Sequence, residues 1–205
     1  MLDGDHLRLV QILSPAFPIG SFAYSQGLET AITDGTVWDA SSLKTWISAI
    51  LQHGSGQSDA ILMAHARRGD ADDLADLALS FSPSLERSLE SIEQGRAFAT
   101  MTGLARPYPL PVAVGVVTRD LAVETATVLA LWLQGLAGQL VSVGVRFIPL
   151  GQSQGQQVLA DLNAAILDVA ARAAVAPLTA IYSTALGADM ASMTHETQEI
   201  RIYRT

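Results

Sequence analysis

The sequence predicts an all-α fold, arranged as a single-domain helical bundle of roughly eight to ten helices, on three observations. Alanine (31 residues) and leucine (27 residues) dominate the composition, and both are strong helix formers. Apolar residues recur at helical spacing along most of the chain. No stretch repeats with a period of about 20 to 50 residues, so a solenoid is not expected. With 205 residues, 49% of them apolar, the chain can form one domain with a sizeable core.

The charge balance excludes two classes of partner. Twelve Lys and Arg residues stand against twenty Asp and Glu residues, which gives a net charge of -8. A nucleic-acid binder needs clustered cations to neutralise phosphates, and with Lys44 as the only lysine no polybasic segment can hold an anionic membrane. Because only 16% of the residues are charged, we expect apolar surface to remain for protein partners, with no nucleic acid and no membrane among them.

The sequence carries no signal for export. Cysteine is absent, and residues 1–5 are acidic and lack the basic start and apolar run of a signal peptide. The longest apolar stretch, residues 127–133, ends at Gln134, far short of the about 18 apolar residues that a membrane span needs. We therefore expect a cytoplasmic protein.

The first predicted helix follows a turn at residues 15–20 and carries Tyr24, Gly27 and Glu29, with Ser21 as its cap. Glycine inside a helix costs about 1 kcal/mol relative to alanine, so a neighbour should need the missing side chain of Gly27. That neighbour is either another helix of this chain or a partner protein, and the residues alone leave both alternatives open.

Further helices are predicted from apolar residues spaced at i, i+3, i+4 and i+7. One begins near Asp39 or Ser41, a shorter one follows Asp70 as cap, and a third begins with Ser82 as cap and Pro83 as first residue. The apolar stripes of these helices and of a later one are Leu43, Trp46, Ile47, Ile50 and Leu51; Leu74, Leu77 and Phe81; Leu85, Leu89, Ile92 and Ala99; and Leu159, Leu162, Ile166, Val169 and Ala173.

Three stretches alternate apolar and other residues with period two, which is also typical of strands: residues 112–116, 141–147 and 200–202. The second lies within a long apolar segment, residues 121–148, whose small residues allow close helix packing. We favour a buried helix there and little or no sheet overall, with strands as the alternative.

The sequence offers little for catalysis. It has no G-x-x-x-x-G-K-[ST] loop for phosphate, and no serine is expected on a nucleophile elbow. His195-Glu196 resembles half of an H-E-x-x-H zinc motif, but Glu199 stands where the second histidine belongs. The acidic residues 70–73 are explained by a helix start, where they complement the dipole. We therefore predict no catalytic residue, no metal ligand and no cofactor; a small helical hydrolase using His195 and Glu196, or a generic helical scaffold, is the alternative.

Three segments resemble the UreF family of urease accessory proteins. Residues 17–29 are similar to the family's N-terminal motif, F-P-x-G-[SA]-[FY]-x-x-S-x-G-L-E. Residues 146–152 resemble its R-x-x-P-L-G-Q segment, and residues 193–205 resemble its ending, H-E-T-Q followed by R-L-F-R-S. Tyr203 stands where the family usually has phenylalanine, and Thr205 stands where it has serine. The matches occur in the family's order and extend over nearly the whole chain.

The resemblance implies an all-helical, usually dimeric adaptor for urease maturation with no enzymatic activity or tightly held cofactor. It implies binding to the scaffold protein UreD, called UreH in some organisms, and recruitment of the GTPase UreG, which carries nickel to apo-urease. Residues 1–205 would form one domain, with residues 193–205 a C-terminal tail that a partner orders. The motif positions expected to bind partners are Phe17, Pro18, Gly20, Ser21, Tyr24, Ser25, Gly27, Glu29, Arg146, Gly151, Gln152, His195, Glu196, Arg201, Tyr203 and Arg204.

Overall fold

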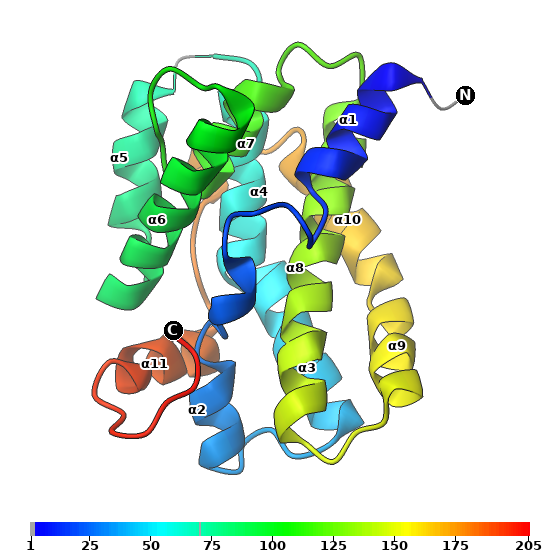
Figure 1. Ribbon diagram of the computed structural model, residues 1–205, viewed down its shortest axis with the longest axis vertical. Helices are drawn as coiled ribbons and strands as arrows, with labels where there is room; N and C mark the ends of the chain where they lie inside the picture. The colour runs from blue at the N-terminus through cyan, green and yellow to red at the C-terminus, as the bar shows by residue number, and fades with distance from the viewer. Residues whose placement is uncertain (1–2, 70) are drawn as a thin grey trace.

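The computed structural model describes residues 3–69 and 71–205, and all regular structure within them is helical (Figure 1). The all-α prediction is confirmed, with eleven α-helices and two short 3-10 helices in the described residues. Their bounds are α1 (Gly4–Ile12), η1 (Ser21–Ala23), α2 (Leu28–Thr33), α3 (Ala40–His53), α4 (Ser55–Ala66), α5 (Asp72–Ser80), α6 (Leu85–Thr102), α7 (Leu110–Thr118), α8 (Thr125–Phe147), α9 (Gln152–Asp161), α10 (Asn163–Ala173), η2 (Leu178–Ala180) and α11 (Leu186–His195).

The long helix α8 is the centre of the core. It packs against α4, α9 and α10, and also against α2 and α3 (Figure 1). Its fully buried side chains, among them Leu129, Leu133 and Leu140, join one continuous apolar cluster. By length and composition α8 is also long enough to cross a membrane, but half of its apolar window is buried inside the protein, as in the core helix of a globular domain.

The predicted start of α3 is confirmed. Asp39 Oδ1 accepts a hydrogen bond from the backbone N–H of Ser42 at 2.8 Å, and Ser42 Oγ accepts one from the backbone N–H of Asp39 at 3.0 Å. This reciprocal pair is a capping box, which satisfies two N–H groups that a helix end leaves free. The apolar stripe of α3 is buried as expected, through Leu43, Ile47 and Leu51.

The prediction for α6 is wrong in its start and in its buried face. The cap is Ser84, whose Oγ accepts from the backbone N–H of Arg87 at 3.2 Å, so neither Ser82 nor Pro83 belongs to the helix. Leu85 and Leu89 are 65% and 47% exposed. The buried side of α6 is largely polar because it faces the C-terminal residues and an internal cavity, both described below.

The alternating stretches contain no strand in the described part of the chain. Residues 112–116 lie in α7 and residues 141–147 lie in α8, so the helical interpretation is confirmed, whereas residues 200–202 are irregular. The stripe of residues 159–173 is divided between α9 and α10, with buried Leu162 at the junction. The predicted cap Asp70 lies outside the described residues.

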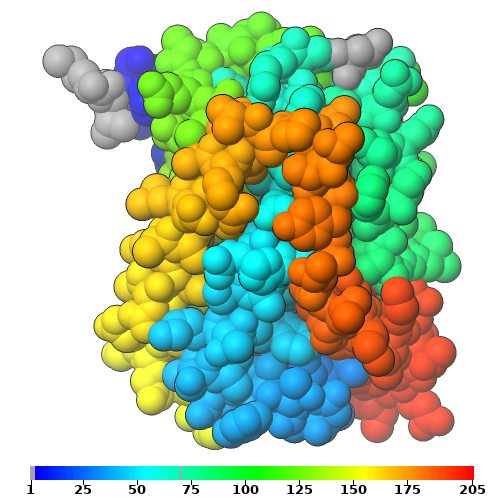
Figure 2. Space-filling view, turned by 180° about the vertical axis from the view of Figure 1, so that it is seen from behind, coloured from blue at the N-terminus to red at the C-terminus, as the bar shows by residue number. Residues whose placement is uncertain are grey.

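The segment of residues 174–185, which contains η2, crosses the back of the molecule and connects α10 to α11 (Figure 2). It is fixed to α3 and α4 by hydrogen bonds from the backbone N–H of Thr184 to His53 O at 2.8 Å and from Ser58 Oγ to Tyr182 O at 3.3 Å. The segment brings α11 beside α2 and α6, and therefore beside the first predicted motif.

Candidate functional site

The first motif forms a tight turn before α2. Gln26 and Gly27 both have positive φ, at 55° and 78°, and Gly27 is the N-cap of α2, not an interior residue as predicted. Ser21 begins the 3-10 helix η1 and makes no side-chain cap. A Cβ on Gly27 would lie 2.6 Å from the backbone N of Ser192 in α11. The neighbour that needs the missing side chain is thus a helix of the same chain.

The C-terminal residues dock onto this turn. Thr205 O accepts hydrogen bonds from Ser25, from the backbone N–H at 2.8 Å and from the hydroxyl. Thr205 Oγ1 accepts one from the backbone N–H of Gln26 at 3.2 Å, and the backbone N–H of Arg204 donates to Ala23 O at 2.8 Å. These bonds connect the backbone of residues 23–26 to residues 204 and 205, and Thr205 is fully buried.

Glu29 holds the middle of the same docked segment. Its Oε1 accepts from the backbone N–H of Ile202 at 2.8 Å, and its Oε2 accepts from the backbone N–H of Tyr203 at 2.9 Å. The carboxylate is buried, so its charge is compensated by donors and not by water. The predicted tail boundary at residue 193 falls inside α11; we use "tail" below for residues 196–205. Within the single chain these residues already pack against α2 and α6, and the ordering of the tail by a partner stays a prediction.

His195 lies between two carboxylates. The ring is fully buried, with Nδ1 2.7 Å from Glu86 Oε2 and Nε2 3.2 Å from Glu29 Oε2. Arg201 forms an ion pair with the other oxygen of Glu86. Glu196 Oε1 accepts from the backbone N–H of Leu85 at 2.7 Å and thereby caps α6. These contacts join α2, α6, α11 and the tail and leave His195 no access to a substrate, so the hydrolase alternative has no site here.

A second ion-pair cluster fixes the end of the tail. The Tyr24 hydroxyl donates to Glu93 Oε2 at 2.6 Å, and Arg204 Nη1 lies 2.8 Å from the same oxygen, with its guanidinium 5.4 Å from the Tyr24 ring centre. Burial, reinforced by the hydrogen bond to Glu93, raises the pKa of Tyr24, while the hydrogen bond from Tyr24 lowers the pKa of Glu93. The phenol therefore stays a neutral donor to a charged carboxylate.

The second motif reaches the tail from the end of α8. Arg146 Nη1 donates to the Tyr203 hydroxyl at 3.3 Å, and the rings of Phe147 and Tyr203 are 5.6 Å apart between centres. Gly151 is the N-cap of α9, where its backbone N–H donates to Gln154 Oε1 at 3.2 Å. We call the surface formed by residues 17–30, 146–152 and 196–205 the motif face.

Residues 151–155 also read G-x-S-x-G, the spacing of a serine nucleophile elbow. In the structure this stretch opens the helix α9 after a short loop that follows α8. An elbow needs a strand before the serine and a histidine beside it, and the four residues before Gly151 form no strand. Ser153 is exposed at the first turn of α9 and is no nucleophile candidate.

A groove of about 320 Å³ opens on the motif face, between η1, α8, α9 and the tail. Its floor is made of small residues of α8, and one wall carries Phe22, which is 71% exposed. The guanidinium of Arg146 lies at its edge and makes no ion pair with any described residue. Ser21, Arg146 and Tyr203 line the groove, so all three motif segments reach it.

The predicted partner-binding residues divide into two groups. Tyr24, Ser25, Gly27, Glu29, His195 and Tyr203 are buried, whereas Pro18, Arg146, Gly151, Gln152, Arg201 and Arg204 are exposed; Phe17, Gly20, Ser21 and Glu196 are half-buried. The expectation that Tyr24 and Glu29 form an accessible surface is corrected, because their side chains face the tail of their own chain. Phe17 packs against Phe98, 5.5 Å between ring centres, below the surface.

Several residues of the site were not predicted. Glu86, Glu90 and Glu93 of α6 contact the motif face from a segment that carries no recognised motif. The helical spacing i, i+4, i+7 places them on one side of α6, which was the available signal. Phe22 was passed over although it occupies an aromatic position of the first motif.

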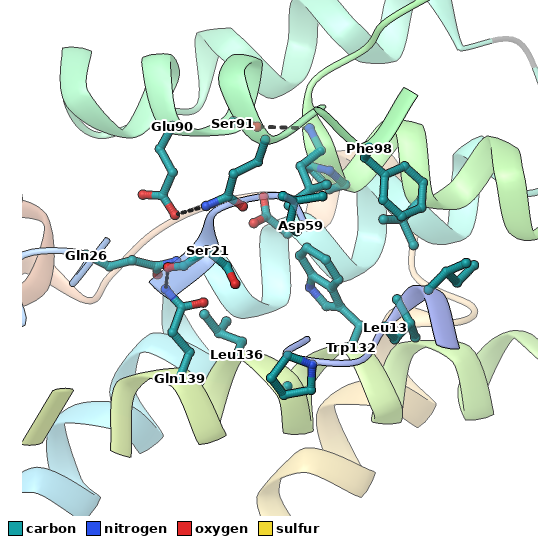
Figure 3. Close-up of a pocket in the computed structure, with 18 of the residues that line it drawn as sticks. Leu13, Ser21, Gln26, Asp59, Glu90, Ser91, Phe98, Trp132, Leu136 and Gln139 are labelled. Atoms are coloured by element: carbon teal, nitrogen blue, oxygen red, sulfur yellow. Dashed lines mark hydrogen bonds between the residues drawn. The ribbon is translucent and has the colours of Figure 1, made fainter. Parts of the chain in front are cut away.

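A small, largely apolar pocket of about 90 Å³ with several polar side chains in its lining lies between α1, α4, α6, α7 and α8 (Figure 3). Asp59 enters it from α4, Glu90 from α6 and Trp132 from α8. Burial raises the pKa of Asp59 to about 6, against the opposing effect of Arg87 and with a smaller contribution from Glu90. No group of three or more His, Cys, Asp or Glu side chains suited to a metal ion occurs in residues 3–69 and 71–205.

Comparison with known proteins agrees with the arrangement of motifs. The UreF family profile matches residues 37–163. A urease accessory protein UreF of Cereibacter sphaeroides (strain KD131) is 54% identical over 97% of this chain and 98% of its own length. Proteins of the same name from Dinoroseobacter shibae and Bradyrhizobium sp. are 45% and 42% identical, over 97% and 100% of this chain and 98% and 95% of their own. This chain, an accessory protein of urease and not an enzyme, therefore belongs to the UreF family.

Proposed function

We propose that this chain is an adaptor of urease maturation, which binds the scaffold protein UreD (UreH) and recruits the GTPase UreG so that nickel is inserted into apo-urease in the cytoplasm. The observation that carries the proposal is the meeting of the three motif segments around one groove. The first segment is more than a hundred residues away from the other two along the chain, yet all three share this face, and none supplies an exposed catalytic nucleophile or a group of metal ligands there. Binding is the activity that such a face supports.

The groove suits a partner segment of defined chemistry. The guanidinium of Arg146 has the Tyr203 hydroxyl as its hydrogen-bond partner but no carboxylate, which favours a carboxylate on the partner protein, with two parallel hydrogen bonds possible. The small residues of the floor leave room for an apolar side chain, and exposed Phe22 provides an aromatic anchor beside it. The chain as a whole is acidic, so the positive charge of Arg146 distinguishes this edge of the groove from the rest of the surface. An acidic partner segment would be oriented by pairing with it.

An adaptor needs a second surface, and exposed apolar side chains of α6, α11 and the tail offer one, an apolar patch that adjoins the motif face and shares the tail with it. The N-terminal end of α6 contacts the C-terminal end of α11, through Ser84 and Ser192. Large apolar side chains of these helices and of the tail are exposed there: Leu85, Leu89, Met190, Met193, Ile200 and Ile202. Exposed apolar residues gathered at one place are typical of protein interfaces.

The proposal is tested by co-expressing the chain with tagged UreD and with UreG. We expect Phe22→Glu, at the groove, and Leu89→Glu, on the patch, each to reduce capture of one partner at least about tenfold, the equivalent of about 1.4 kcal/mol, and to keep the other. Leu167→Glu on α10, similarly exposed and remote from both surfaces, is the matched control. Full capture of both partners by both variants, or equal loss in the control, would contradict the proposal.

A homodimer is part of the same proposal, because two copies would present two sets of these surfaces. Sedimentation of the isolated chain at increasing concentration measures it. A monomer at all concentrations, alone and with UreD, would remove the dimer from the proposal and leave the adaptor role standing.

A further inference from the structure

The short turn that carries Phe22 has no buried residue of its own. Phe22 is the middle residue of the 3-10 helix η1, and none of the three residues of η1 is buried. Its ring is 71% exposed on the wall of the groove. A segment with so little apolar packing is free to move unless hydrogen bonds from other parts of the chain hold it. The position of Phe22 therefore depends on the polar contacts of η1.

Gln139 of α8 supplies two of these contacts. Its Nε2 donates to Ser21 O at 2.6 Å and to Tyr24 O at 2.9 Å, so the two acceptors enclose Phe22 along the chain (Figure 3). Because both acceptors are carbonyl oxygens, the amide must turn its nitrogen toward η1, and both of its hydrogens are used. One side chain thus connects both ends of the turn to the central helix of the core.

The tail supports the same turn from a different point. The backbone N–H of Arg204 donates to Ala23 O at 2.8 Å, which fixes the residue after Phe22. Gln139 adds the contact to Ser21, the residue before Phe22. The two supports come from different parts of the chain, so the contribution of Gln139 can be removed while the tail keeps its own hydrogen bonds.

Gln139 also lies between two hollow regions of the molecule. It lines both the groove of about 320 Å³ and the pocket of about 90 Å³, and Pro15, Ser21 and Gly135 likewise line both. A side chain that borders two open spaces is not fixed by close packing on all sides. Its two hydrogen bonds therefore set its conformation, and with it the place of η1 on the wall of the groove.

We propose that Gln139 is a positioning residue for partner recognition, which holds η1 so that Phe22 is presented at the groove before a partner arrives. The inference rests on the proposed function, in which Phe22 anchors a partner segment. An anchor that is already in place loses less conformational freedom on binding than one that must first be ordered. For one side chain this difference corresponds to a factor of about 3 to 10 in affinity.

The first arm of the experiment measures the turn itself in the full-length chain. Amide hydrogen exchange is followed at Ala23 and Tyr24, whose N–H groups donate within the turn, in the wild type and in Gln139→Leu, which has no donor. We expect both amides to exchange at least about fivefold faster in the variant, while the tail amide of Tyr203, which lies outside the turn, keeps its wild-type rate. Unchanged exchange at Ala23 and Tyr24 would overturn the proposal.

The second arm tests whether Gln139 acts through Phe22, by a double-mutant cycle in the co-expression assay with tagged UreD and UreG. For the partner that Phe22→Ala releases, we expect Gln139→Leu to weaken capture about three- to tenfold in the wild type and less than about twofold in the Phe22→Ala background. Gln52→Leu on α3 is the matched control, because Gln52 is also half-buried and donates within its own helix, to Ser48 Oγ at 2.7 Å. Equal losses in the two backgrounds, or an equal loss in the control, would overturn the proposal.

This proposal and the proposed function fail in different ways. If Phe22→Ala leaves the capture of both partners unchanged, the proposed function is wrong about the groove and the positioning role falls with it. If Phe22→Ala weakens capture but Gln139→Leu does not, only the positioning role is wrong. Should Gln139→Leu fail to fold, Gln139→Glu replaces it in both arms, since an ionised glutamate has the same shape and no donor, and the same outcomes decide.

Discussion

Around α8 the contacts are apolar, with Leu129, Leu133 and Leu140 fully buried in one cluster. On the motif face the contacts are polar, and Glu29 alone accepts from two tail amides and faces His195. Apolar packing adjusts partly when a side chain shrinks, whereas a buried donor that loses its acceptor keeps the full cost of desolvation. Mutations in the apolar core around α8, which we call the body, are therefore expected to lower the free energy of unfolding by graded amounts. A mutation that removes an acceptor on the motif face is expected to release the whole tail at once.

The largest effect is expected in the body. Leu133→Ala removes a fully buried side chain from α8 and should lower the free energy of unfolding by about 2–5 kcal/mol, the usual range for such a cavity. Urea denaturation measures this change. Trypsin cleavage at exposed Arg201 should increase only as far as global unfolding does, and selective cleavage of the tail in this variant would contradict the contrast between the two regions.

Glu29→Ala should release the tail. It leaves the N–H groups of Ile202 and Tyr203 without their acceptor and takes away one of the two carboxylates beside the buried ring of His195, at a cost of about 3 kcal/mol or more. Trypsin should cut at Arg201 well below the urea concentration that unfolds the body. Glu29→Gln retains one acceptor oxygen and should restore part of the protection; a tail as resistant as in the wild type after Glu29→Ala would show that the carboxylate does not hold it.

The pH dependence of stability gives a case in which a substitution of a polar buried group should stabilise the protein. The pKa of Asp59 is raised from 3.8 to about 6 in the folded state, so this group favours the folded state below about pH 4 and loses that contribution as the pH rises toward 6. The total is at most about 3 kcal/mol. Asp59→Asn should therefore stabilise the protein more at pH 7.5 than at pH 5.5 in urea titrations. An equal effect at both pH values would show that ionisation of Asp59 does not contribute to the pH dependence of stability.

The last prediction concerns a single close contact, that between Gly27 and the backbone of α11. Gly27→Ala and Gly35→Ala both place a side chain at φ near 80°, but only at Gly27 does the new Cβ meet backbone, 2.6 Å from Ser192 N. Gly35→Ala should cost about 1 kcal/mol from the backbone alone, and Gly27→Ala about 1–2 kcal/mol more. Equal losses in thermal unfolding would mean that α11 moves aside without cost.

The fold was largely accessible from sequence because α3 and α8 bury apolar residues at helical spacing. The buried face of α6 was missed because its stripe of leucines is exposed and Arg87, Glu90 and Gln94 point inward. The sequence around α6 does not reveal this, because Arg87 and Gln94 bond Glu90 within the helix, and the partner outside it, Thr205, lies more than a hundred positions away. The motif resemblance identified the correct segments of the site but gave no indication that Tyr24, Glu29 and His195 are buried against one another.

The tryptophans give this protein a spectroscopic handle. Trp38 is largely exposed, whereas the indole N–H groups of Trp46 and Trp132 are buried without a hydrogen-bond partner, and Trp132 lines the cavity that holds Asp59. Indole emission shifts to the red when water reaches the ring. A variant with Trp38 and Trp46 replaced by phenylalanine would leave Trp132 as the sole tryptophan. Its emission maximum would report, in real time, when water enters the pocket around Trp132, without a label on the tail.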